Sequence, residues 1–303
     1  MPSVPGWKEI PKYPVVFGIA LLATGVTVAW WTGTNISPLF ENAQIRRGQF
    51  WRFATSVLPH LDIFHLAFNL YWLWVLGTVV ERVYGHLRTV LLLLLFAVGS
   101  SSWDFALAQG GIGLSGVGYG LFGLLYLLSR HDERFTDSLD KKTVNLFVGW
   151  FFICIFTTAT HLFNVANVAH AAGLVLGLLL GYALVLPARR TLIASTAVAL
   201  ILFGFCGATF GRPFVNLSTY GGYEEARWGY DALIADRNEE AIRWYRDAVK
   251  YQPKVPSFWF NLGIAYQRSK DDTAASLAYQ RAYELEPSKP QYAEAAGEEV
   301  RSK

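Results

Sequence analysis

Three pairs of polar residues interrupt apolar stretches of this chain, and their types suit hydrolytic chemistry. They are His65 and Asn69, Ser115 and Tyr119, and Asn167 and His170. A serine hydroxyl attacks a carbonyl when an imidazole accepts its proton, and the resulting oxyanion needs hydrogen-bond donors. Ser115 and His170 can supply the nucleophile and the general base. His65, the Asn69 amide and the backbone N–H of Ser115 can supply the donors.

The spacing of these residues favours a two-residue catalytic dyad. Tyr119 follows Ser115 by about one helical turn, so we expect its ring to support the His170 imidazole by packing. No carboxylate lies in the stretches that carry the serine and the histidine, and Asp104 comes just before the first of them. A third member of a triad is therefore not visible in the sequence.

Structural explanations compete with this interpretation. A serine in a membrane helix usually bonds to its own helix backbone, and a lone membrane histidine is more often a packing residue. Residues 113–117 (GLSGV) miss the GxSxG motif because the second glycine comes one residue early, and that motif also needs a preceding strand. A metal site would rely on histidines without an acidic or cysteine ligand, so we expect no bound metal. These histidines are His60, His65, His161 and His170.

The composition places these residues in a membrane protein. Of the 303 residues, 53% are hydrophobic and only 16% are charged, against about 25% charged residues in a soluble domain. This excludes a disordered, collagen-like or disulfide-stapled chain, and both cysteines, Cys154 and Cys206, lie in apolar runs. The net charge of +3 gives no case for nucleic-acid binding. Charges are concentrated towards the C-terminus, which indicates an all-α membrane bundle followed by a soluble helical domain.

Seven stretches are apolar enough for membrane spans of roughly 20 residues. Their ranges are 14–31, 61–80, 89–108, 111–128, 144–160, 165–186 and 191–210. The second, fourth and sixth carry the polar residues about 5–12 Å from their starts, at 1.5 Å per residue. Because alternate spans start on the same membrane face, these residues should lie at one depth. That convergence favours the catalytic interpretation over the structural ones.

Closely spaced glycines should bring the serine and the histidine together. Those around the serine are Gly113, Gly116, Gly118, Gly120 and Gly123, and those after the histidine are Gly173, Gly177 and Gly181. Small faces of this kind allow two helices to pack closely, so we expect spans 111–128 and 165–186 to touch. Gly113, Gly116, Gly173 and Gly177 are the expected supporting residues of the site.

Lysines and arginines in the short loops predict the orientation of the spans. Ten lie on one side, namely Lys8, Lys12, Arg82, Arg88, Arg130, Arg134, Lys141, Lys142, Arg189 and Arg190. Three lie on the other side, namely Arg46, Arg47 and Arg52. The excess places the N-terminus in the cytoplasm and, after seven spans, the C-terminal segment outside.

The first loop mixes these three arginines with aromatic residues. The aromatic residues are Phe40, Phe50, Trp51 and Phe53. Such a mixture predicts a segment that lies in the lipid headgroup region, with a solvated loop carrying a few aromatic anchors as the alternative.

From about residue 223 the chain becomes charged and rich in alanine and tyrosine, with a 34-residue period. Matching positions are Ala241 and Ala275, Tyr245 and Tyr279, Ala248 and Ala282, and Pro253 and Pro287. This is the tetratricopeptide pattern, which typically binds protein partners, although plain helical hairpins are an alternative. We predict a six-span core over 1–187, a seventh span and linker over 188–217, and a repeat domain over 218–303.

The ordered motifs resemble the rhomboid intramembrane serine proteases over about residues 48–182. The residues that carry the resemblance are Trp51-Arg52, His60, His65, Asn69, Glu81, Gly113-Leu114-Ser115-Gly116, Tyr119 and Ala169-His170-Ala171-Ala172-Gly173. The resemblance implies that Ser115 is the nucleophile and His170 the general base, and that His65 and Asn69 line the oxyanion hole. It also implies cleavage of transmembrane segments near the outer membrane surface, without a metal or cofactor. The repeat tail resembles a bacterial subgroup, which implies a bacterial plasma membrane.

Two functions remain open from the sequence. One is an active protease whose tail recruits or screens protein clients. The other is a non-catalytic membrane adaptor that binds clients through its tail and groove. Ser115 and His170 are both present, which favours the protease. We also expect removal of the tail after about Gly211 to leave the six-span core intact.

Overall fold

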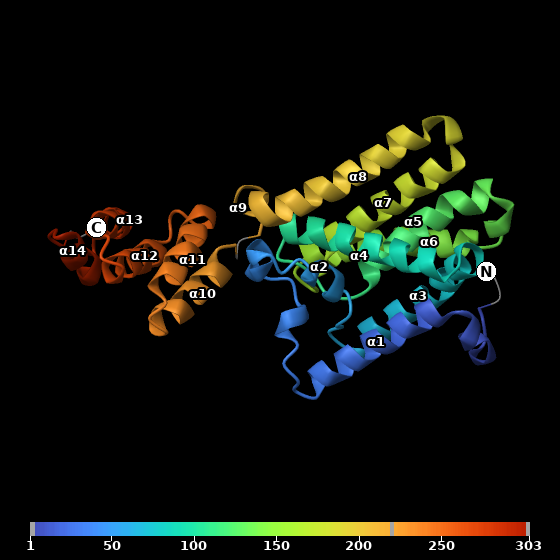
Figure 1. The fold of residues 1–303 in the computed structure, drawn as a ribbon, viewed down its shortest axis with the longest axis horizontal. Helices are drawn as coiled ribbons and strands as arrows, with labels where there is room; N and C mark the ends of the chain where they lie inside the picture. Colours follow the sequence, from blue (N-terminus) through green and yellow to red (C-terminus); the bar gives the residue numbers. More distant parts are fainter. Residues whose placement is uncertain (1–3, 219–220, 301–303) are drawn as a thin grey trace. The chain divides into compact units, whose positions relative to one another are not determined.

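A computed structural model describes residues 4–218 and 221–300 of the chain (Figure 1). Over these residues the regular structure is helical and no strand occurs, which confirms the all-α prediction. The chain divides into two compact units, Met1–Arg212 and Pro213–Lys303. Each unit is described separately below, and the finer three-part division at residues 187 and 217 stays a prediction.

The first unit is a bundle of long apolar helices. Its helices are α1 (Pro14–Trp31), α2 (Arg52–Thr55), α3 (Ile63–Tyr84), α4 (His86–Leu107), α5 (Ser115–His131), α6 (Lys141–Ala159), α7 (Asn167–Val185) and α8 (Arg190–Cys206). A π-helical turn, η6 (Gly207–Gly211), follows α8 and leads into α9 (Arg212–Val215). By length and composition, six helical segments of the described residues could cross a membrane.

Helix α5 is not among these six, because it has only 17 residues. It starts at Ser115, four residues later than the predicted start at 111, because residues 108–114 form a loop. Gly110 and Gly113 in that loop have φ angles of +91° and +98°, which favour glycine and interrupt a helix. A length of 17 residues still lies within the range of roughly 17–25 found for spanning helices, so the fourth predicted span, over 111–128, stays a prediction.

Helices α5 and α7 form the centre of the bundle through glycine contacts. A Cβ atom added to Gly173 would lie 2.1 Å from the carbonyl oxygen of Gly116, and one added to Gly177 would lie 2.1 Å from that of Gly120. The two backbones therefore touch where any side chain would separate them. Helix α7 also packs against α4 and α8 (Figure 1).

Large apolar side chains cover the outer faces of the bundle. Leu21 on α1 is 56% exposed, Phe152 on α6 is 64% exposed and Phe203 on α8 is 68% exposed. A continuous apolar exterior of this kind suits lipid rather than water. Together with the long apolar helices, it identifies this unit as an integral membrane domain.

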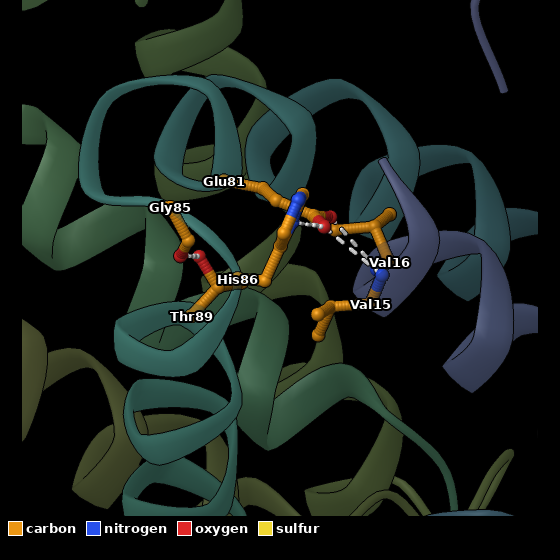
Figure 2. Close-up of polar contacts among 6 residues, drawn as sticks. All are labelled: Val15, Val16, Glu81, Gly85, His86 and Thr89. Carbon is orange, nitrogen blue, oxygen red and sulfur yellow. Dashed lines mark hydrogen bonds and ion pairs between the residues drawn. The ribbon is translucent and has the colours of Figure 1, made fainter. Parts of the chain in front are cut away.

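A single carboxylate joins α1, α3 and α4 at one end of the bundle, as Figure 2 shows. Glu81 is 2% exposed, and its two oxygens accept the N–H groups of Val15 and Val16, both at 2.9 Å. Helix α1 starts at Pro14, so these N–H groups have no partner within their own helix. The Nδ1 atom of His86 lies 2.7 Å from Oε1 of the same carboxylate. We call this arrangement the Glu81 clasp.

The second unit contains paired helices with a repeated contact. Its helices are α10 (Tyr223–Ile234), α11 (Asn238–Tyr251), α12 (Pro256–Arg268), α13 (Asp272–Leu285) and α14 (Pro290–Ala296). A Cβ atom added to Gly229 would lie 2.8 Å from the Tyr245 ring, and one added to Gly263 would lie 2.5 Å from the Tyr279 ring. The same glycine–tyrosine contact thus closes both helix pairs, as the 34-residue period predicts.

Candidate active site

The structure brings Ser115 and His170 into direct contact. Ser115 is the first residue of α5 and His170 lies in the first turn of α7, and the distance between Ser115 Oγ and His170 Nε2 is 2.7 Å. The imidazole is 3% exposed. The glycine contact between α5 and α7 lies directly beyond this pair and fixes the separation of the two helices. At this distance the serine hydroxyl can donate to the imidazole when Nε2 carries no proton.

The far side of the His170 imidazole is held by packing. The Tyr119 ring lies against it with centroids 4.7 Å apart and planes inclined by 31°, and the Tyr119 hydroxyl donates to the Phe147 carbonyl at 3.1 Å. Within the part of the chain that the structure describes, the buried Nδ1 atom of His170 has no hydrogen-bond partner. The described residues thus contain no triad carboxylate at this atom.

His65 and Asn69 occupy the first two turns of α3, beside the loop that precedes Ser115. Asp62 caps this helix by accepting the N–H of His65 at 2.9 Å. A Cβ atom added to Gly113 would lie 2.7 Å from the His65 ring, so the loop passes close to that imidazole. The Asn69 amide donates to the His65 carbonyl at 2.9 Å, which occupies one of its two N–H donors.

His60 holds the end of the same loop. Its Nδ1 atom lies 2.9 Å from the Leu58 carbonyl, and its Nε2 atom accepts the N–H of Leu114 at 3.3 Å. Burial, together with the neighbouring His65, lowers the pKa of His60 to about 4. His60 is therefore neutral at ordinary pH, with a proton on Nδ1 and a lone pair on Nε2. Its role is to position the residue before Ser115.

Two acidic residues contact the backbone on either side of the pair. The Glu41 carboxyl accepts the N–H of Gly111 at 3.0 Å, and the Asp104 carboxyl accepts the N–H of Ala169 at 3.2 Å. Ala169 immediately precedes His170 in the chain. Sequence reasoning considered Asp104 only as an absent triad member and did not identify Glu41.

The first loop differs from the predicted interfacial segment. Arg52 is 5% exposed and donates to the carbonyls of Ser37 and Phe40, both at 2.7 Å, and Phe53 is fully buried. The prediction that Arg52 and Phe53 lie among lipid headgroups is therefore wrong. Backbone carbonyls of the loop satisfy the guanidinium, so that charge can be buried. Trp51 remains 53% exposed.

Asn167 and His161 lie outside the serine–histidine pair. The Asn167 amide donates to the Thr158 hydroxyl at 2.8 Å and to the Cys154 carbonyl at 3.3 Å. It therefore ties the start of α7 to the end of α6. His161 is an exposed residue with a φ angle of +56° in the turn between these helices.

Comparisons with known proteins give matches in both units of the chain. Residues 47–187 match the rhomboid domain family model, residues 234–270 match a TPR repeat model and residues 256–289 match a tetratricopeptide repeat model. The chain is 26% identical to the rhomboid protease GluP of Bacillus subtilis over 264 residues, which cover 75% of this chain and 50% of that protein.

Two further relatives match the membrane unit. The chain is 32% identical to the rhomboid protease GlpG of Yersinia pseudotuberculosis over 136 residues, and 33% identical to that of Pectobacterium atrosepticum over 137 residues. Each match covers 44% of this chain and 48% of the relative. The chain thus spans about half the length of the curated relatives it matches. The predicted resemblance to rhomboid proteases and the predicted repeats are confirmed.

Proposed function

We propose that this chain, which carries a rhomboid domain over residues 47–187, is an intramembrane serine endopeptidase. Its substrates are transmembrane segments of other proteins, which it cleaves near the outer face of the bilayer. The observation that carries the proposal is the 2.7 Å contact between Ser115 Oγ and His170 Nε2. The relatives named as rhomboid proteases support the same reaction class.

In this mechanism His170 acts as general base and then as general acid. Its Nε2 atom accepts the Ser115 proton while Oγ attacks the scissile carbonyl, and the imidazolium then returns the proton to the leaving amine. Water hydrolyses the resulting acyl-enzyme in a second step that uses the same base. The Tyr119 ring, 4.7 Å from the imidazole, stabilises the imidazolium through its electron-rich face.

The start of α5 supplies part of the oxyanion site. Ser115 is the first helical residue, so its N–H has no partner within α5 and lies at the positive end of the helix dipole. His65 and the second N–H of the Asn69 amide complete the donor set. Gly113 and Gly116 keep the flanking backbone free of side chains, and Gly173 keeps α7 in contact with α5.

We expect the Asn69→Ala variant to lower kcat by about 10²–10³, the usual loss for one preorganised donor. KM should change little, because this donor acts on the charge that develops in the transition state. Michaelis kinetics on a reconstituted transmembrane substrate measure both constants. The Asn167→Ala variant is the matched control, since that amide bonds to Thr158 instead. An unchanged kcat for Asn69→Ala would remove Asn69 from the mechanism.

Covalent labelling tests the proposed function directly. A fluorophosphonate probe should label the wild-type chain at Ser115 in detergent micelles and should not label the Ser115→Ala variant. The reagent reports an activated serine without requiring the natural substrate. A folded wild-type protein that stays unlabelled, and that cleaves no transmembrane substrate, would favour the non-catalytic adaptor.

We also propose that the N-terminus is cytoplasmic and that the repeat domain lies outside and recruits or screens protein clients. The distribution of lysine and arginine among the loops supports this orientation, and the repeat matches support protein binding. Protease added to intact spheroplasts should therefore digest residues after about 218. A tail that resists digestion until the cells are lysed would place it in the cytoplasm and contradict extracytoplasmic recruitment.

Removal of the repeat domain should separate recruitment from catalysis. The cut after Gly211 that the sequence suggests would also remove Arg212, which is 4% exposed and belongs to the membrane unit. The cut is therefore placed after Leu217. A chain that ends after Leu217 should still cleave a short generic substrate at close to the full-length rate, whereas cleavage of a native client should weaken several-fold. Cleavage rates of both substrates, measured for the truncated and the full-length chain, test this prediction. Equal loss on both substrates would contradict a recruiting role.

A further inference from the structure

The end of the last apolar helix is joined to the first loop by a backbone contact. The Thr209 carbonyl lies in the π-helical turn η6, and the residue four positions later is Pro213, which has no N–H to donate. The Nε atom of Arg46 donates to this carbonyl instead, at 3.2 Å. A π-helical turn next to a proline also changes the direction in which the following side chains point. Arg212 directly follows this π-helical turn.

Arg212 caps the C-terminal end of α4. Its Nε atom donates to the Phe105 carbonyl at 2.7 Å and its Nη2 atom donates to the Ala108 carbonyl at 3.2 Å, while its Cζ atom lies 3.9 Å from the Phe105 ring centroid. The Phe105 carbonyl belongs to the last turn of α4 and the Ala108 carbonyl to the residue that caps it, where helical partners are missing and the helix dipole is negative. Arg212 thereby fixes the first residue of the loop that leads to Ser115.

Glu41 holds the middle of that loop. Its Oε2 atom accepts the N–H of Gly111, and a Cβ atom added to Gly110 would lie 2.8 Å from the same oxygen. Burial raises the pKa of Glu41 well above its usual range and the nearby Asp104 raises it further, whereas the Gly111 N–H and the Arg212 guanidinium lower it. Arg212 thus lies close enough to this carboxyl to act on its charge.

The same end of α4 also reaches the histidine. Asp104, in the last turn of α4, accepts the N–H of Ala169, the residue before His170. The end of α4 thus contacts the backbone directly before His170, and the loop that follows this helix end leads to Ser115. Arg212 lies near the end of the last apolar segment, Pro187–Val215, and is a residue through which this segment contacts the end of α4.

We propose that Arg212 and Glu41 are positioning residues that keep Ser115 and His170 at reacting distance, so that the last apolar helix forms part of the protease machinery. This inference rests on the proposed protease function. A displacement of about 1 Å at a reacting group can cost about 10² in rate. Loss of either residue should therefore slow the chemical step and leave substrate binding nearly unchanged.

The test compares single variants of the full-length chain in reconstituted vesicles. The Arg212→Gln variant should lower kcat by about 10–10² with KM within about twofold, and Arg212→Lys, which retains the charge, should recover part of the loss. Glu41→Ala should behave like Arg212→Gln. Glu41→Gln should retain most of the activity, because an amide oxygen can still accept the Gly111 N–H. The rate of fluorophosphonate labelling should follow kcat across the series.

The Glu81→Ala variant is the matched control for a purely structural effect. Glu81 is also a buried carboxyl that accepts backbone N–H groups, but it lies about 16 helical residues from His65, on the order of 24 Å along α3. Its loss should lower the melting temperature and leave kcat of the folded fraction unchanged.

Three results would be decisive. Normal kcat and labelling in Arg212→Gln and Glu41→Ala, with only a lower melting temperature as in the control, would overturn the inference. If Arg212→Gln does not fold, equal activity of Glu41→Ala and Glu41→Gln would overturn it as well. A wild-type chain without Ser115-dependent labelling would refute the proposed function itself.

Discussion

Replacement of Ser115 by alanine should lower the cleavage rate of a transmembrane substrate by about 10⁴ or more, and His170→Ala should do the same. The hydroxyl and the imidazole act as one unit across their 2.7 Å contact. The double variant should therefore be no slower than either single variant. Cleavage of a reconstituted substrate, followed by gel electrophoresis and mass spectrometry of the products, measures all three.

Ser102 provides the matched control for the serine. It is fully buried, and its hydroxyl donates to the Gly99 carbonyl of its own helix at 3.1 Å. Ser102→Ala should remain active within about threefold, since it removes one ordinary intrahelical hydrogen bond. Substantial activity in Ser115→Ala, or additive losses in the double variant, would contradict the dyad.

The Gly173→Ala variant should abolish activity through packing alone. Its new Cβ atom would lie 2.1 Å from the Gly116 carbonyl oxygen, so the two helices must separate at the level of the catalytic pair. Overpacking of a rigid core costs about 1–3 kcal/mol, and the accompanying shift of His170 should cost a further 10² or more in rate. Thermal unfolding in detergent and kcat measure the two effects separately.

Gly118 is the control on the neighbouring helix. A Cβ atom added there meets no atom within 4 Å, so Gly118→Ala should retain the stability and the activity of the wild type. Alanine should even favour the helix slightly over glycine. A tolerated Gly173→Ala, with normal melting temperature and rate, would show that α5 and α7 do not need their backbone contact.

The sequence predicted the parts of the site that follow a helical period. The glycines around Ser115 and after His170 recur with helical spacing, and this pattern alone indicated that the two helices touch. The start of α5 was placed too early because residues 111–114 are as apolar as the helix that follows them. Only the positive φ angles of Gly110 and Gly113 separate the loop from the helix, and hydropathy does not report backbone angles.

The positioning groups could not be predicted because they act over long separations without a pattern. Glu41 and Gly111 are 70 residues apart, and Arg212 is 107 residues from Phe105. A loop that mixes arginine with aromatic residues has the same composition whether the arginine faces lipid or folds inward, as Arg52 does. Its burial depends on carbonyls that only the folded loop brings together.

The Glu81 clasp has a consequence for the order of assembly during synthesis. The N–H group of Val15 is synthesised first, but its acceptor Glu81 follows 66 residues later. At about 5–20 residues per second, the ribosome needs roughly 3–13 seconds to supply it. During that interval the start of α1 has only water or lipid headgroups as partners. The first helix can therefore take its final place only after α3 has been synthesised as far as Glu81 and this carboxylate has reached the start of α1.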